Sequence, residues 1–137
     1  LIDNGAGSKF NDKMKDIYQL DNSSKELHRS LSEHGFTVSD ITDVIFTHLH
    51  FDHCGGTTYY TEEGDLEHTF PNATYHVAEA HWKSAIEPNA REKASFLPEN
   101  IGPLQESDNL KAKRIMKLET QLRIFYFQKN PFFVFIG

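Results

Sequence analysis

The chain has 137 residues, of which 38% are hydrophobic and 25% are charged, and its formal net charge at pH 7 is −6. This length and composition predict one soluble globular domain and exclude a fibrous or intrinsically disordered chain. The acidic balance argues against nucleic-acid binding, because a nucleic-acid footprint needs a stripe of basic side chains that neutralises phosphates.

Three further features of the sequence concern compartment and partners. No apolar run approaches the roughly 20 residues that a membrane-spanning helix needs, so no membrane partner is expected. No signal peptide is visible, and a cytoplasmic location is favoured. The basic side chains at residues 111–117 form the only basic cluster, and it is expected to be a solvated face.

The amino-terminal residues predict a strand end followed by a short helix. Residues 1–3 are typical of the end of a buried strand, and residues 4–7 form a glycine-containing turn. Apolar side chains then recur at helical spacing, which predicts an amphipathic helix over residues 9–19. These side chains are Phe10, Met14, Ile17 and Tyr18.

A second helix is predicted from Ser23 to Gly35. Ser23 and Glu26 form a capping-box pattern, and Gly35 is a suitable residue to end the helix. Leu27 and Leu31 provide its apolar stripe. The two histidines of this region, His28 and His34, are expected at the surface.

The stretch at residues 47–56, here called the ligand loop, directly follows a predicted buried strand at residues 44–47. It concentrates candidate metal ligands within six positions, and these are His48, His50, Asp52 and His53. Continued extended backbone would turn His48, His50 and Asp52 to one side. The other side would carry Leu49 and Phe51 into a core.

This pattern predicts a zinc site in the ligand loop. Neutral imidazole and carboxylate groups are ligands that zinc prefers. The alternative is that some of these histidines only cap, pack or lie in solvent. Cys54 lies beside the candidates and has a metal or redox role as one alternative, and a purely steric role before two glycines as the other.

The remainder of the sequence predicts further α/β elements. Residues 57–68 are polar and predict a surface loop, with a substrate lid as the alternative. A turn at 70–73, a strand at 74–77 and a helix at 79–87 follow, the helix ending before Pro88. Residues 89–96 predict one or two further turns. Two apolar strands are predicted at 122–127 and 132–136.

The ligand loop, with its preceding threonine and its Gly-Gly end, resembles the signature of the metallo-β-lactamase-fold hydrolases. The resemblance implies that His48 and His50 bind one metal ion, and that Asp52 and His53 bind a second. It gives Asp52 a catalytic role in orienting the nucleophile, a zinc-bound hydroxide. It also implies that Asp3 is a buried structural partner of the loop, with a solvated turn aspartate as the alternative.

The segment from Phe70 through Trp82, with Pro88-Asn89 and Leu97-Pro98, resembles the lactonase-like branch of this superfamily. The resemblance covers residues 1–107, whereas residues 108–137 form a divergent tail. It implies an α/β fold, the N-terminal portion of an αββα sandwich, and a small-molecule ester or lactone as substrate.

Later metal ligands of the family, including a histidine in a Gly-His-Thr segment, are not recognisable. No histidine follows His81 in the sequence. Whether His76, His81 or Asp108 replaces these ligands stays open. We therefore expect residues 1–137 to be a single partial domain, truncated at both ends. Two other functions stay open: a catalytically incomplete fragment with weak or no metal binding, and a thioester hydrolase of the glyoxalase II type.

Overall fold

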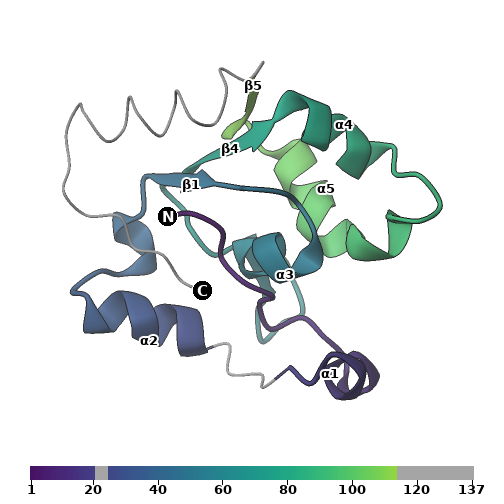
Figure 1. The fold of residues 1–137 in the computed structure, drawn as a ribbon. Coiled ribbons are helices and arrows are strands. Elements are labelled where there is room, and N and C mark those ends of the chain that lie inside the picture. Colours follow the sequence, from purple (N-terminus) through teal and green to yellow (C-terminus); the bar gives the residue numbers. More distant parts are fainter. Residues whose placement is uncertain (21–24, 114–137) are drawn as a thin grey trace.

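The computed structural model describes residues 1–20 and 25–113, whose larger sheet has three parallel strands (Figure 1). The strands are β1 (Asp43–Ile45), β4 (Thr74–Ala78) and β5 (Leu110–Lys113), in the order β1-β4-β5. Ile2 makes a single parallel bridge to Ile45 on the outer side of β1. The expected α/β organisation is confirmed.

The chain leaves β1 and β4 in the same direction and enters a helix after each (Figure 1). After β1 comes the short helix α3 (Phe51–Cys54), and after β4 comes α4 (Glu79–Ile86). The predicted strand at 74–77 and helix at 79–87 are therefore confirmed. Because parallel strands end at the same edge of a sheet, the segments after β1 and β4 lie close together.

Helix α2 (Lys25–Glu33) confirms the second predicted helix. Leu31 is fully buried, and Gly35 adopts the left-handed conformation with a φ of 78° just after the helix. His28 and His34 are exposed, as expected. The predicted capping box involves Ser23, which lies outside the described residues.

Helix α1 (Asp12–Tyr18) is shorter than predicted and buries none of its residues. The predicted helix is therefore present, but Ile17 is 62% exposed and Tyr18 is 45% exposed, so its apolar side chains are not buried in the core. The aromatic ring of Tyr18 instead packs on Phe51, 4.9 Å away between centroids, and both contact the buried Phe10.

The polar segment predicted as a loop or lid at residues 57–68 is a β-hairpin. Strands β2 (Thr58–Tyr60) and β3 (Leu66–His68) pair in antiparallel fashion, and the turn between them contains Gly64 at a φ of 91°. β-branched and aromatic residues favour strands, which explains β2. The loop prediction is therefore wrong.

Two elements after residue 97 were not predicted. Helix α5 (Pro98–Glu106) begins with a proline in its first turn and buries Ile101 and Leu104. β5 pairs in parallel with β4, so residues 111–113 of the expected solvated face belong to the sheet. The strands predicted at 122–127 and 132–136 lie outside the described residues.

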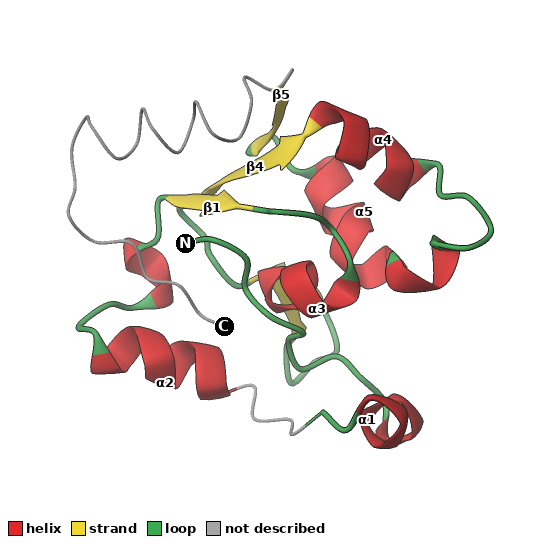
Figure 2. Ribbon diagram, viewed as in Figure 1, coloured by secondary structure: helices red, strands yellow, loops and turns green. Residues whose placement is uncertain are grey.

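The core lies between the sheet and the surrounding helices (Figure 2). Phe46 and Tyr75 stack with parallel rings in it, at a centroid distance of 6.1 Å. Short 3-10 turns complete the described structure, at Val38–Asp40, Gly55–Thr57 and Lys93–Ser95. Among the described residues, no helix is long and apolar enough to cross a membrane.

Candidate metal centre

The ligand loop is extended at first and then helical. His50 has β-region dihedrals (φ −68°, ψ 153°) and forms the N-cap of α3, whose first bonds run from the His53 and Cys54 N–H groups to the His50 carbonyl. Asp52 therefore reaches the site from a helix, so the prediction of continued period-2 alternation is wrong beyond His50. Leu49 is fully buried, as expected.

The loop brings three of the four predicted ligands to a common point. Ligand atoms of His48, His50 and Asp52 all lie within 4.8 Å of one another. Two atoms bound to one zinc ion at about 2.0–2.2 Å are at most about 4.4 Å apart. The three donors are thus gathered near the spacing that one ion requires, and two imidazoles with a carboxylate are a donor set that fits a divalent ion.

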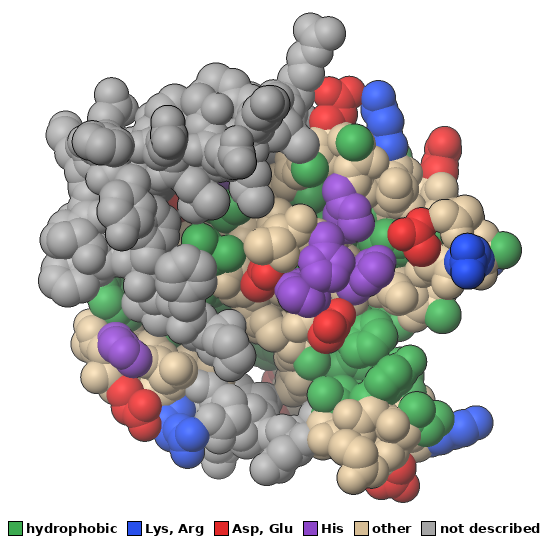
Figure 3. Space-filling view, viewed as in Figure 1, with side chains coloured by type: hydrophobic (Ala, Val, Ile, Leu, Met, Phe, Trp, Pro, Cys, Tyr) green, Lys and Arg blue, Asp and Glu red, His purple; other side chains and the backbone are tan. Residues whose placement is uncertain are grey.

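The fourth predicted ligand, His53, lies at the edge of the same group. Its ring is 3.8 Å from that of His48, and its Nε2 is 3.5 Å from Asp52 Oδ2. Histidine side chains gather there in one surface patch with acidic side chains at its border (Figure 3). The pairing of ligands into two separate metal sites stays a prediction.

His50 provides the clearest sign that the group is built for a ligand. Its Nε2 atom is buried and has no hydrogen-bond partner within the described structure. Buried polar atoms almost always have a partner, so an orphaned one calls for an explanation. A metal ion is a suitable partner for an unprotonated imidazole nitrogen.

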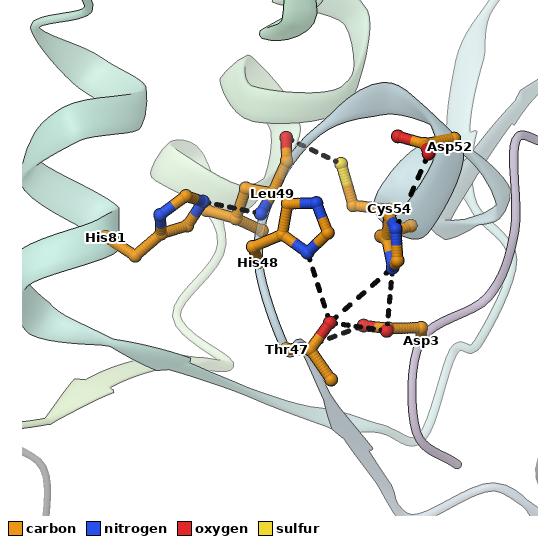
Figure 4. Close-up of polar contacts among 8 residues, drawn as sticks. Asp3, Thr47, His48, Leu49, Asp52, Cys54 and His81 are labelled. Atoms are coloured by element: carbon orange, nitrogen blue, oxygen red, sulfur yellow. Dashed lines mark hydrogen bonds and ion pairs between the residues drawn. The ribbon is translucent and has the colours of Figure 1, made fainter.

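Asp3 anchors the ligand loop, as the resemblance implied (Figure 4). Its Oδ1 accepts the Thr47 N–H at 2.8 Å, and its Oδ2 accepts the Thr47 hydroxyl at 2.6 Å. Oδ2 also accepts from His53 Nδ1 at 2.9 Å. The proton of His53 is therefore on Nδ1, which leaves Nε2 free to act as a ligand. The φ of Asp3 is 48°, a left-handed conformation that aspartate tolerates better than most residues.

His48 is held in the neutral form that metal binding requires. Burial lowers its pKa, and the neighbouring imidazoles of His53 and His50 lower the pKa further. Its Nδ1 lies 3.2 Å from the Thr47 hydroxyl oxygen. Because that hydroxyl donates to Asp3, its oxygen accepts from Nδ1–H, and His48 Nε2 stays unprotonated.

Both backbone polar groups of Leu49 form hydrogen bonds to side chains (Figure 4). His81 Nε2, from α4, accepts the Leu49 N–H at 2.7 Å, and the Cys54 thiol donates to the Leu49 carbonyl at 3.3 Å. Burial raises the pKa of Cys54 to about 12. Cys54 is fully buried, its thiol faces a backbone carbonyl, and it is not part of the ligand group found among the described residues, which favours the steric interpretation.

The Gly-Gly end of the loop packs against the amino-terminal segment. A Cβ at Gly55 would overlap the Ala6 carbonyl, and a Cβ at Gly7 would overlap the Gly55 carbonyl. Lys9 Nζ donates to the carbonyls of Gly55 and Thr58, at 2.5 and 2.6 Å. Burial lowers the pKa of Lys9 to about 8. The sequence did not indicate Lys9, because a single half-buried lysine leaves no periodic signal.

The three residues considered as replacement ligands have different positions. His76 Nε2 bonds Asp43 Oδ1 at 2.7 Å across β4 and β1, and Asp108 is exposed just before β5. Neither belongs to the ligand group found among the described residues. His81 lies beside the group, but its Nε2 already accepts a hydrogen bond from the Leu49 N–H. Its pKa is lowered by burial and by the nearby His48 and His50.

Comparisons with known proteins agree with this geometry. A family model described as the metallo-beta-lactamase superfamily matches residues 1–120. The structure of a probable metal-dependent hydrolase from Staphylococcus aureus is similar, with 30% identity and a TM-score of 0.71 over 82% of this chain and 39% of that one.

Two further solved structures share the fold at 23% identity. AidC, a dizinc quorum-quenching lactonase in complex with a product, has a TM-score of 0.55 over 85% of this chain and 40% of its own. The hydrolase AbOPH of the beta lactamase superfamily has a TM-score of 0.56 over 85% of this chain and 39% of its own. The chain thus spans about two-fifths of the length of these structures. No curated protein matches the chain.

Proposed function

The chain belongs to the metallo-beta-lactamase superfamily, and on this premise we propose that it carries the metal-binding loop of a zinc-dependent hydrolase. The observation that carries the proposal is the convergence of His48, His50 and Asp52 within 4.8 Å of one another. The orphaned Nε2 of His50 supports it independently.

In this proposal His48 and His50 hold one zinc ion, and Asp52 and His53 hold a second. A bound zinc ion supplies a nucleophile at neutral pH by lowering the pKa of a water molecule, and it polarises the oxygen of the group under attack. Two features of the chain prepare the imidazoles for this task. The Asp3 carboxylate fixes the tautomer of His53, and burial keeps His48 neutral.

Asp52 is proposed as the catalytic residue of the loop. Its side chain is 55% exposed at the rim of the group, in contrast to the partly covered imidazoles. A carboxylate in this position accepts a hydrogen bond from an attacking water and orients it toward the substrate. Its place in the first turn of α3 is fixed by the His50 N-cap.

We propose an ester or lactone as the substrate class. The similarity to the hydrolase from S. aureus supports hydrolysis, and the shared fold with the lactonase AidC supports a lactone. A thioester stays the competing substrate.

Zinc content tests the metal site directly. The purified chain is dialysed with zinc, freed of loose metal and analysed for bound zinc. We expect at least one ion per chain, reduced by His50→Ala or Asp52→Ala and unchanged by His28→Ala, which alters an exposed histidine on α2. Less than half an ion per chain would instead support the catalytically incomplete fragment.

Turnover then tests the substrate class. The zinc-loaded chain, and a longer protein that contains it if the gene encodes one, are assayed with an N-acyl homoserine lactone and with a thioester. Faster lactone opening supports the proposal. Faster thioester hydrolysis would assign the chain to the competing class. Zinc binding without turnover of either substrate, by the chain and by the longer protein alike, would refute the proposed substrate class.

A further inference from the structure

We propose that His81 is a positioning residue of the metal centre: it accepts the N–H of Leu49 and thereby fixes the backbone between His48 and His50. The inference rests on the proposed function, because the segment that His81 holds carries two of the proposed zinc ligands. It assigns His81 a role other than that of a replacement ligand.

The position of Leu49 makes this hydrogen bond important. Leu49 lies between the two ligand histidines, its side chain is fully buried, and its carbonyl is already bound by the Cys54 thiol. The bond from its N–H to His81 Nε2 is 2.7 Å long. A buried N–H without a partner is energetically unfavourable, so removal of this acceptor would favour a rotation of the peptide. That rotation would move both His48 and His50.

The fold explains why a residue of α4 reaches this peptide. β1 and β4 are parallel neighbours, with Ile45 opposite His76. The ligand loop follows β1, and α4 follows β4, so both leave the sheet at the same edge (Figure 1). His81 lies in the first turn of α4 and is thus brought to residues 48–50 by strand pairing, not by sequence proximity.

Ring packing holds the His81 imidazole in place. Its centroid is 5.9 Å from that of His48 and 6.0 Å from that of His50. Phe96, which is buried, contacts both His81 and His50, at 5.7 and 5.1 Å. Phe96 therefore restricts rotation of both rings at once, and the acceptor nitrogen stays directed at Leu49.

The hydrogen bond also defines the protonation of His81. An atom that accepts an N–H cannot itself carry a proton, so Nε2 is unprotonated and the ring proton is on Nδ1. Nε2 cannot bind a metal ion while it holds Leu49. A positioning role and a ligand role therefore predict different spectra and different responses to substitution.

The first test needs no metal. Long-range ¹⁵N–¹H correlation on the metal-free chain at pH 7.5 identifies the protonated nitrogen of each histidine. We expect the Nδ1–H form for His81, with a scalar coupling across the hydrogen bond to the Leu49 amide. A His81 ring protonated on Nε2, or on both nitrogens, would overturn the proposal whether or not the chain binds zinc.

The second test compares two substitutions. His81→Gln retains an acceptor that can reach Leu49, whereas His81→Phe removes the acceptor and retains a ring. We expect His81→Phe to weaken zinc affinity by about 10- to 100-fold, the usual effect of losing a group that orients ligands. His81→Gln should stay within about threefold of the parent chain, with an unchanged cobalt(II) absorption spectrum. His28→Phe is the control on an exposed site.

The outcomes separate this proposal from the proposed function. Equal affinity of His81→Phe and the parent would show that His81 positions nothing. Equal losses in both variants, with an altered cobalt spectrum for His81→Gln, would identify His81 as a ligand. If His81→Phe does not fold, the tautomer measurement on the parent decides. Failure of the parent itself to bind zinc would refute the proposed function and leave the hydrogen bond to be judged by the first test.

Discussion

The ligand loop and helix α1 both combine a helical turn with aromatic residues, yet the fold treats them very differently. The loop is tied by Asp3, Lys9 and His81, which lie far from it in sequence. Helix α1 buries none of its residues and leaves Ile17 62% exposed. The contrast shows that the local apolar pattern alone does not determine which segment is held in place, since the ligand loop is bound by polar contacts from distant parts of the chain and α1 is exposed.

The largest predicted effect concerns the Cys54 thiol, which should react far more slowly than a cysteine in a solvent-exposed segment. The pKa of Cys54 is raised from 9.0 to about 12 by burial, so at pH 8 the folded chain should hold about 1,000-fold less thiolate than an ordinary cysteine. Alkylation by iodoacetamide should be slower by at least that factor in the folded chain than in urea. Rapid alkylation without denaturant would mean that the ligand loop opens readily.

The raised pKa of Cys54 also affects how the free energy of unfolding depends on pH. A raised pKa means that the folded state keeps its proton between pH 9 and about 12, while the unfolded state loses it. The thiol therefore contributes a loss of stability as pH rises above 9. In Cys54→Ala this contribution to the pH dependence of the free energy of unfolding should be absent, as measured by urea denaturation.

Gly55→Ala tests the close packing of the loop on the amino-terminal segment. The added Cβ would overlap the Ala6 backbone, and neither chain segment can yield easily. We expect the free energy of unfolding to fall by about 3 kcal/mol in urea denaturation. Gly102→Ala, where the Cβ would meet no atom within 4 Å, should change it by less than about 1 kcal/mol. Similar effects of both substitutions would contradict the close packing.

Asp3→Asn should weaken the loop without a change in side-chain size. The amide NH₂ would face the Thr47 hydroxyl and His53 Nδ1–H, both of which donate to Oδ2 in the parent. We expect zinc affinity to fall by about 10- to 100-fold in a competition titration. Asp65→Asn, in the exposed hairpin turn, is the control. Unchanged zinc affinity in Asp3→Asn would show that Asp3 does not support zinc binding by the loop.

A substitution on helix α1 should have the smallest effect on the free energy of unfolding. Because Ile17 is exposed, Ile17→Ser should alter the free energy of unfolding by less than about 0.5 kcal/mol. Leu31→Ala, in the fully buried position of α2, should cost about 2–5 kcal/mol in the same assay. A cost above 1 kcal/mol for Ile17→Ser would show that α1 is covered in solution, and the contrast between the two regions would be lost.

The sequence was informative where one segment contained the whole signal. The ligand loop, β4 and α4 were predicted because their patterns are local. The hairpin was missed because a five-residue turn of four polar residues and a glycine, at 61–65, separates its short strands. Helix α5 contains Pro98, Gly102 and Pro103, which conceal the buried face formed by Ile101 and Leu104.

In the site, too, features with a local sequence signal were predicted and contacts between distant residues were not. The sequence indicated the four candidate ligands, and the family resemblance indicated Asp3 as well. It could not indicate the bond between His81 and Leu49, which joins residues 32 positions apart. Nor could it indicate that Lys9 reaches the carbonyls of Gly55 and Thr58. Contacts of this kind depend on strand pairing, which no local pattern records.

The parallel sheet has a consequence for how quickly the chain folds. Asp43 pairs with Thr74 and Tyr75 pairs with Leu110, so each pairing closes a connection of roughly 30 residues before it gains any contact. The histidines of the ligand loop are neighbours along the chain from the start, but Asp3 and His81 reach them only after this closure. The rate of refolding should therefore be independent of zinc, which would be captured only by chains whose sheet has already assembled.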